Sequence, residues 1–160
     1  EFISKTNMPI IIMHMQKEPI NMQINPKYSF APIDIYNIFS KKITDLVDAG
    51  VKKSNIVIDP GIGFGKTLSD NLNIFKYLPL FHGLGVPILI GASRKSLIGE
   101  LTVKDYKFRG KNKKDISPSK RLSGSLAFAI HANMCGVQIL RTHDVFETNQ
   151  ALICQKSLDL

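Results

Sequence analysis

Short apolar runs and amphipathic stretches alternate along the chain. An apolar run of four to six residues is typical of a buried strand, and apolar residues recurring every three to four positions are typical of a helix. The runs predict strands at residues 8–13, 56–58, 87–90 and 136–140. The periodic stretches predict helices from Pro32 to just before Gly50, and over residues 69–78, 119–134 and 145–156. The predicted order is four strand–helix units.

The predicted strands are apolar throughout and do not alternate with polar residues. This pattern favours a parallel sheet covered by helices on both faces. A flavodoxin-like doubly wound domain and half of a (βα)8 barrel both consist of such α/β units. No internal repeat or low-complexity linker divides the sequence, so we predict a single domain over residues 1–160.

The composition suits a compact domain whose charge is unevenly distributed. The 160 residues are 44% hydrophobic and carry a net charge of +8. Eight basic and two acidic residues between Lys104 and Arg121 contribute +6 of this charge, so a basic face spread over the domain, as in a nucleic-acid-binding protein, is not indicated. We interpret residues 104–120 as a solvated insert that interrupts a helical region. Because it follows the third strand, the insert is expected near the carboxyl ends of the strands, where it would attract anionic substrates.

The cysteines and the apolar runs argue against several other classes of protein. Cys135 and Cys154 are far apart and belong to no metal-binding cluster, so neither a zinc site nor a disulfide scaffold is indicated. The longest apolar run, Met8–Met13, is too short to span a bilayer and lacks the flanks of a signal peptide. We therefore expect a cytoplasmic protein with no membrane partner. Because the sequence begins at Glu1 rather than Met, we also expect residues upstream of it.

Chemically distinctive residues stand at the carboxyl end of every predicted strand. They are Met13, His14, Asp59, Ser93, Lys95, Arg141 and His143. In a parallel barrel these ends open onto one face, which carries the active site and often a phosphate site. The cationic groups suit phosphate, and Asp59 can accept two hydrogen bonds from an amino-heterocycle. Met13 and Phe64 offer apolar surfaces on which a ring can rest.

Several of these residues also have a purely structural interpretation. Asp59, followed by Pro60 and Gly61, is equally compatible with a turn in which the carboxylate caps its own backbone. Arg94 and Lys95 could be a solvated pair, and Asp144 suits the N-cap of the last helix whatever the role of His143. We interpret His14 as a packed histidine rather than as a catalyst.

Five motifs, in order along the chain, closely resemble those of dihydropteroate synthases. They are Met-His-Met-Gln at 13–16, Asp-Pro-Gly-x-Gly-Phe-Gly-Lys at 59–66, Gly-x-Ser-Arg-Lys-Ser at 91–96, Arg-Leu-Ser-Gly-Ser-Leu-Ala at 121–127 and Arg-x-His-Asp-Val at 141–145. The resemblance implies a (βα)8 barrel of the TIM type. It also implies the condensation of 6-hydroxymethyl-7,8-dihydropterin diphosphate with p-aminobenzoate in folate biosynthesis.

The resemblance assigns a role to each site residue. Asp59 resembles the carboxylate that holds the aminopyrimidine edge of the pterin, and Ser93 resembles the serine near the aminobenzoate carboxylate. Lys95 is similar to the lysine between the two substrates, and Arg141 and His143 to the pair that holds the diphosphate. Lys95, Arg141 and His143 are thus the implied catalytic residues. Phe64 and Met13 resemble pocket walls, and Mg2+ is the implied cofactor.

The sequence departs from this family in its extent. It contains only four of eight βα units, and these resemble the second half of the barrel. The first-loop Asn that helps to hold Mg2+, and the Asp and Asn that complete the pterin pocket, have no counterpart. We therefore expect no metal ligand in this chain and no catalysis without the missing amino-terminal half, in cis or in trans. A homodimer is a further expectation left open.

Three other hypotheses stand beside that of a synthase fragment. The missing half favours a non-catalytic pterin-binding remnant or an interaction module. A pterin-binding methyltransferase domain would share the barrel and the pterin carboxylate, but gives less reason for Ser93 with Lys95 and for Arg141 with His143. Nucleic-acid binding would rest on the basic insert alone, and we expect no nucleic-acid partner.

Overall fold

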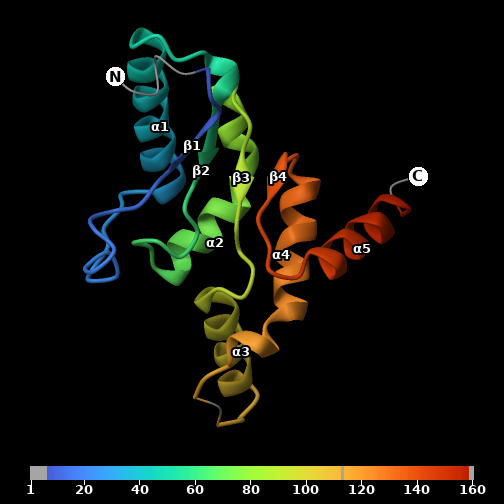
Figure 1. Cartoon of the computed structure of the whole chain (residues 1–160). Coiled ribbons are helices and arrows are strands. Elements are labelled where there is room, and N and C mark those ends of the chain that lie inside the picture. Colours follow the sequence, from blue (N-terminus) through green and yellow to red (C-terminus); the bar gives the residue numbers. More distant parts are fainter. Residues whose placement is uncertain (1–6, 113, 159–160) are drawn as a thin grey trace.

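The computed structural model describes residues 7–112 and 114–158, and Figure 1 shows strands and helices alternating along them. The strands are β1 (Ile10–Met13), β2 (Ile56–Asp59), β3 (Leu89–Ile90) and β4 (Ile139–Leu140). The helices are α1 (Ala31–Asp48), α2 (Leu68–Lys76), α3 (Ser96–Phe108), α4 (Leu122–Met134) and α5 (Val145–Lys156). Short 3-10 helices η2 (Lys53–Asn55), η3 (Leu78–Leu84) and η4 (Pro118–Lys120) lie between them. The chain is thus of the α/β class, as predicted.

All four strands run parallel. Strand β1 pairs with β2 from Ile10 opposite Ile56 to Met13 opposite Asp59, and β3 pairs with β4. A parallel bridge between Ile58 and Ile88 joins the two pairs, and the Ile58 amide donates to the Pro87 carbonyl at 2.9 Å. The strands therefore lie in the order β1-β2-β3-β4, each beside its neighbour in the sequence.

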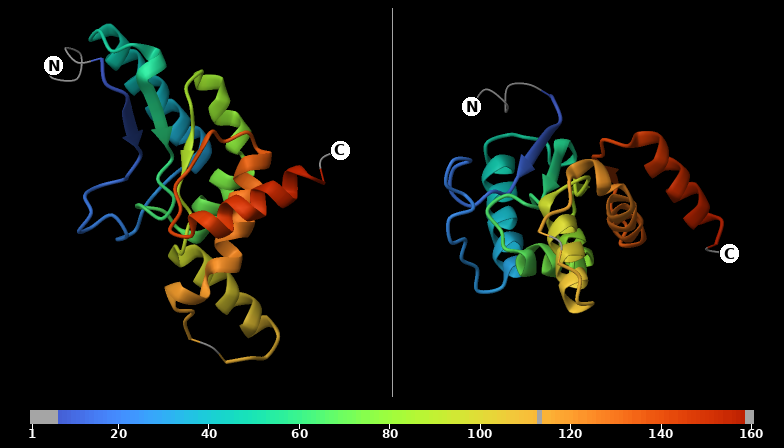
Figure 2. Two further views of the ribbon diagram at one scale, coloured as in Figure 1. Left: turned by 45° about the vertical axis from the view of Figure 1, so that its right-hand side comes forward. Right: turned by 90° about the horizontal axis from the view of Figure 1, so that it is seen from below.

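The core lies between the sheet and helices that cover one of its faces. Ile56, Ile58 and Ile90 from the strands pack with Ile35 and Phe39 of α1 in one buried apolar cluster. Pro32 lies in the first turn of α1, where its fixed φ suits a helix start, and the apolar stripe faces inward as predicted. Seen from below, α1, α2 and α4 lie on the same side of the strands (Figure 2).

The prediction that helices cover both faces of the sheet is wrong for one face, because apolar side chains of the two outer strands, β1 and β4, are exposed there. Ile11 and Met13 of β1 are 57% and 37% exposed, and Ile139 of β4 is 39% exposed. Within the described residues β1 and β4 each pair with only one strand. The sheet therefore has one uncovered apolar face, here called the open face, which includes Ile11, Met13 and Ile139. Its two outer edges have no strand partner among the described residues.

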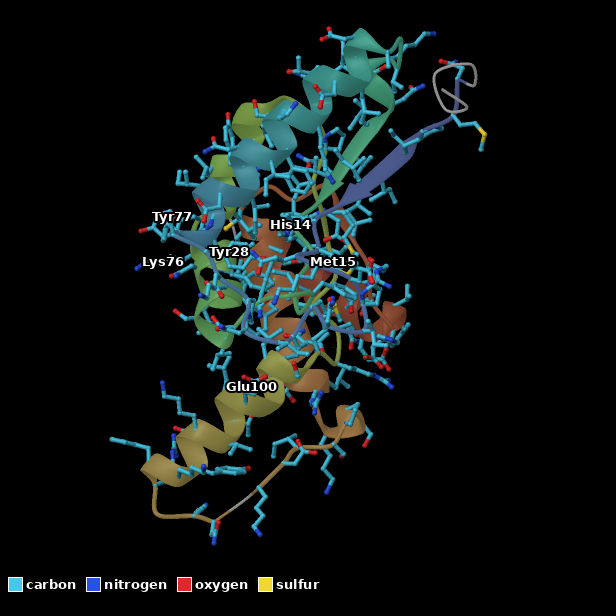
Figure 3. The ribbon with its side chains drawn as sticks, turned by 90° about the vertical axis from the view of Figure 1, so that its left-hand side faces the viewer. His14, Met15, Tyr28, Lys76, Tyr77 and Glu100 are labelled. Atoms are coloured by element: carbon cyan, nitrogen blue, oxygen red, sulfur yellow. The ribbon has the colours of Figure 1, made fainter. Side chains whose placement is uncertain are left out.

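The segment after β3 also differs from the prediction. Helix α3 was not predicted as a separate element, and the first residues of the basic insert, 104–108, extend it. Figure 1 places α3 and the loop after it beyond the carboxyl ends of the strands, while α4 returns along the sheet. In Figure 3 the side chains on the far half of α3 project away from the rest of the molecule. The insert is thus partly helical. Glu1 and Lys113 lie outside the described residues.

Within the described ranges, no helix combines the length and the apolar character needed to cross a membrane.

Candidate active site

The strand register gathers the predicted site on the open face of the sheet. Met13 lies opposite Asp59 in the β1–β2 ladder, and Arg141 follows the β3–β4 ladder opposite Gly91. Side chains two residues apart share a face. Arg141 therefore joins Met13 and Asp59 on the open face. Gly91 leaves room for it, because a Cβ there would lie 3.2 Å from Arg141 Nε.

Asp59 is buried at the end of β2 and begins a glycine-rich turn. One of its carboxylate oxygens accepts the backbone N–H of Gly61 at 2.8 Å. The capping that the turn interpretation required is therefore present, and it leaves the second oxygen available to a ligand. The two interpretations of Asp59 are compatible.

Every carbonyl of the turn at residues 61–65 accepts a hydrogen bond from a side chain outside the turn. Lys66 Nζ donates to the carbonyls of Gly61 and Phe64, both at 2.9 Å. The other three donors are Lys95 to Ile62, Gln23 to Gly63 and Tyr28 to Gly65. Since these donors come from several segments, the tertiary structure determines the shape of the turn.

Phe64 and Lys95 meet across two loops. Lys95 Nζ lies 4.1 Å from the centroid of the Phe64 ring, a cation–π distance. Gly63 makes this approach feasible, since a Cβ there would come within 3.2 Å of the Lys95 side chain. Two residues predicted to line the site are thus in direct contact.

A pocket of about 160 Å³ lies between the loops that follow β3 and β4. Its lining residues are Gly91, Ser93, Lys95, Arg141, Thr142 and His143. Ser93 Oγ lies 2.9 Å from Nδ1 of His143 and accepts the His143 backbone N–H at 3.2 Å. When Oγ donates to Nδ1 of the neutral ring, the imidazole proton resides on Nε2. Two cations and an oriented imidazole make this pocket suitable for an anion.

Arg94 is an anchor for this loop rather than a solvated residue. Its guanidinium pairs with Asp144 through both carboxylate oxygens, and its φ of 58° is left-handed. Ser125 of α4 accepts the Arg94 backbone N–H at 2.9 Å, and Arg121 donates to its carbonyl at 2.9 Å. Asp144 is the N-cap residue of α5, as predicted, but its carboxylate makes no capping hydrogen bond and pairs with Arg94 instead.

Burial shifts the pKa of four groups around the site. It raises the pKa of Asp59 above its usual 3.8, against the lowering effects of the Gly61 amide, Lys95 and Arg141. Burial lowers the pKa of Lys95 to about 8, opposed by Asp59. It also lowers the pKa of Lys66 to about 7 and, together with nearby Lys66, that of His14 to about 3.

The structure places most of the predicted site residues close together, and it adds others. Lys66, the last residue of the glycine-rich motif, is buried, and its ammonium donates to two carbonyls of the turn. His14 is buried and packed, as predicted, with Nδ1 at 3.0 Å from Lys66 Nζ. Ser96, the first residue of α3, is exposed beside Lys95, at a helix start with no side-chain cap. Both residues belong to motifs noted in the sequence, at 59–66 and 91–96, but their contacts depend on where the chain returns and could not be predicted from those motifs.

The Mg2+ implied by the resemblance would need several oxygen ligands, such as Asp and Glu carboxylates. The described residues contain no cluster of three His, Cys, Asp or Glu side chains that could hold a metal ion. No magnesium ligands are therefore assigned to the described residues, and the Mg2+ implied by the resemblance stays a prediction.

Parallel α/β units with a buried carboxylate and an anion pocket at the strand ends are typical of enzymes that bind phosphorylated ligands. A family model described as "Pterin binding enzyme" matches residues 1–143, and the chain belongs to this family. It is similar to the dihydropteroate synthase of Escherichia coli, with 41% identity over 152 residues, which are 95% of this chain and 50% of the relative.

Solved structures give the same result. A dihydropteroate synthase from Yersinia pestis, in complex with a sulfonamide drug, matches with a TM-score of 0.86 and 38% identity over 98% of this chain and 53% of that one. The enzyme from Xanthomonas albilineans with 4-aminobenzoic acid matches with a TM-score of 0.81, 34% identity and coverage of 98% and 51%. The resemblance to this family of transferases is thus confirmed, and the chain spans about half the length of these relatives.

Proposed function

We propose that this chain supplies the carboxyl-terminal half of a cytoplasmic dihydropteroate synthase. The whole enzyme would join 6-hydroxymethyl-7,8-dihydropterin diphosphate to p-aminobenzoate and release diphosphate. The observation that carries the proposal is the open face itself: a buried carboxylate with one free oxygen lies beside a pocket lined by Lys95, Arg141 and His143. A pterin with a diphosphate group needs both features at once.

Each residue has a proposed role in this reaction. Asp59 accepts hydrogen bonds from the aminopyrimidine edge, while Phe64 and Met13 contact the ring. Arg141 and the Nε2–H of His143 bind the diphosphate and stabilise its charge as the carbon–oxygen bond ionises, which is an electrostatic contribution. Lys95 lies between the two and can contact the pterin and the arylamine. The arylamine nitrogen then attacks the resulting pterin cation.

The contacts of Ser93 favour an indirect role for its side chain. Its hydroxyl is engaged with His143, so Ser93 acts by orienting that imidazole. The exposed start of α3 at Ser96 offers backbone N–H groups and the positive end of a helix beside Lys95. We place the aminobenzoate carboxylate nearer to Ser96, with Ser93 as the neighbouring contact.

The rest of the barrel is proposed to close on the open face. Among the described residues no further strand pairs with β1 or β4, and Ile11, Met13 and Ile139 expose apolar surface there. An amino-terminal half, in cis or in trans, would pair with both edges and bury this surface. The same half would supply the Mg2+ ligands and the rest of the pterin pocket, so the chain alone would not turn over substrate.

Reconstitution tests this proposal directly. The chain would be combined with the amino-terminal half of the E. coli relative, and dihydropteroate formation would be measured with and without a sulfonamide. We expect activity that is lost in Asp59→Ala and Arg141→Ala variants and kept in Asp48→Asn, which alters an exposed carboxylate on α1. Assembly of the two halves without turnover under any condition would count against the proposal.

A second candidate is a non-catalytic pterin-binding remnant, which the coverage of only about half of the relatives' length favours. Titration of the isolated chain with a pterin and with diphosphate separates the two functions. Binding without turnover, even after reconstitution, would identify the remnant.

A further inference from the structure

Lys66 is a buried charged residue for which the proposed reaction has no use. Its side chain is 4% exposed, and its ammonium has three protons to donate. Three close acceptors surround it: the carbonyls of Gly61 and Phe64 at 2.9 Å, and Nδ1 of His14 at 3.0 Å. The His14 carbonyl is more distant, at 3.4 Å. Donors and close acceptors are therefore equal in number.

This equality of donors and acceptors determines the tautomer of His14 when Lys66 is charged. An ammonium cannot accept a hydrogen bond, so Nδ1 of His14 must accept and the ring proton must reside on Nε2. The ring is held between Tyr28 and Phe39, at centroid distances of 6.0 and 6.4 Å, and it stays neutral because burial lowers its pKa to about 3. Figure 3 shows His14 and Tyr28 close together near the end of β1.

A neutral Lys66 amine would have two protons and one lone pair. The two protons match the two carbonyls, and the lone pair can accept from His14 if the ring proton moves to Nδ1. No acceptor of the turn would then lose its donor. The pair can thus satisfy the turn in both protonation states of Lys66, by exchanging donor and acceptor roles.

We propose that Lys66 is the positioning residue of the turn at residues 61–65, and that Lys66 and His14 exchange these roles when Lys66 releases a proton to solvent. The His14 proton moves from Nε2 to Nδ1 by exchange with water, so the ring stays neutral. The turn keeps its shape, with Gly61 on Asp59 and Phe64 under Lys95, across neutral pH. The importance of this turn for pterin binding rests on the proposed function, whereas the proton exchange does not.

The charges around the pair are consistent with a change of protonation near neutrality. Burial, with a smaller contribution from Lys95, lowers the pKa of Lys66 to about 7, although Asp59 and Asp70 partly oppose this shift. On the histidine side, Lys66 and Lys42 of α1 both disfavour an imidazolium. Tyr28, whose hydroxyl donates to the Gly65 carbonyl, stays protonated because burial raises its pKa to about 12.

The test uses the unmodified full chain labelled with 15N. Spectra of the Lys66 amine, the His14 ring nitrogens and the glycine amides would be recorded from pH 5.5 to 9. We expect Lys66 to titrate near pH 7, and His14 to change from Nε2–H to Nδ1–H over the same range. The amides of Gly61, Gly63 and Gly65 should shift only slightly. A His14 tautomer that stays constant while Lys66 titrates, or a Lys66 that stays charged to pH 9, would overturn the exchange.

Variants separate positioning from general stability. Lys66→Arg keeps a permanent cation, so His14 should remain Nε2–H up to pH 9. Lys66→Met removes the donors, and the distinct shifts of the three turn glycines should be lost, whereas Lys52→Met, at an exposed lysine, should leave them unchanged. Unaltered glycine shifts in Lys66→Met would overturn the positioning role. A chain that shows the exchange but binds no pterin would contradict the proposed function and leave this inference standing.

Discussion

Asp59, the residue proposed to bind the pterin, lies in an unfavourable environment for its charge. It is 6% exposed at the end of β2, and burial raises its pKa. A carboxyl whose pKa is raised by folding binds its proton more tightly in the folded chain. Its contribution to stability is therefore full below its usual pKa of 3.8 and is lost as the pH rises through the folded value. At neutral pH the ionised group costs stability.

Asp59→Asn should therefore stabilise the chain while abolishing its ligand contact. The amide oxygen can still accept the Gly61 N–H, but the buried charge is removed. We expect the free energy of unfolding at pH 7 to rise by about 0.5–2 kcal/mol, measured in urea. Affinity for a pterin should fall by about 10- to 100-fold, the loss expected for charged hydrogen bonds. Asp48→Asn on the surface serves as the control, and a destabilised Asp59→Asn would contradict this account.

Lys95 should give the anion pocket a pH dependence. Its pKa is lowered to about 8, so its charge is lost as the pH rises through 8. Diphosphate binding, measured by calorimetry, should weaken between pH 7 and 9, and Lys95→Arg should weaken less because arginine stays charged. Diphosphate changes its own protonation equally in the experiments with the wild type and with Lys95→Arg, so the difference between the two proteins reports on residue 95. Since the folded chain binds fewer protons than the unfolded chain between pH 8 and 10.5, Lys95 should also make the wild type more stable as the pH rises through that window. Parallel binding curves for both proteins would contradict this prediction.

The turn at residues 61–65 shows how an element depends on its neighbours. Its glycines have positive φ, which glycine adopts at little cost, but Gly61 and Gly65 also face backbone. A Cβ on Gly61 would lie 1.9 Å from the His14 carbonyl oxygen, and one on Gly65 would lie 2.8 Å from that of Gln16. The glycines therefore allow the segment after β1 and the turn after β2 to approach closely.

Gly110 provides a matched control for this steric role. Gly61 and Gly110 have φ of 70° and 71°, but a Cβ on Gly110 would have no neighbour within 4 Å. Gly110→Ala should cost only the backbone strain, about 1–2 kcal/mol. Gly61→Ala should cost clearly more in urea unfolding, because β1 and the turn must separate. Equal costs for the two variants would show that the contact with His14 is not tight.

The helices differ in how strongly local sequence specifies them. Helix α1 has an apolar stripe and a proline in its first turn, and its predicted extent is close to the observed one. Helix α2 has a complete capping box between Thr67 and Asp70 and was also predicted. Helix α3 was missed because few of its residues are buried and its far half is basic and exposed. A helix that buries few side chains has few apolar residues at helical spacing, so its sequence carries little periodic signal.

At the scale of the whole molecule, the open face is the main surface that lacks a packing partner among the described residues. It has two strand edges without partners among the described residues, and Ile11 exposes 57% of its surface there. Apolar surface next to free strand edges favours association with other chains. The unpartnered chain is thus expected to self-associate in solution.

A charge on the open face should reduce both this association and the reconstitution. Ile11→Lys should give a more monomeric chain in sedimentation experiments, and it should also assemble poorly with an amino-terminal half, because the lysine would be buried at the interface. Ile33→Lys, at a 43% exposed position on α1, should change neither property. Equal effects of the two variants would argue against the open face as the assembly surface.

The sequence by itself determined the strand–helix order, the parallel sheet and the residues at the strand ends. These depend on local patterns: apolar runs, helical periodicity, and the glycines and proline after Asp59. Which contacts the polar groups make was decided only by the tertiary structure. The contacts of Lys66 with His14, Arg94 with Asp144, and Ser93 with His143 each join segments far apart in the chain. The burial that sets the charge states of Asp59, Lys66 and Lys95 likewise exists only once these segments pack together.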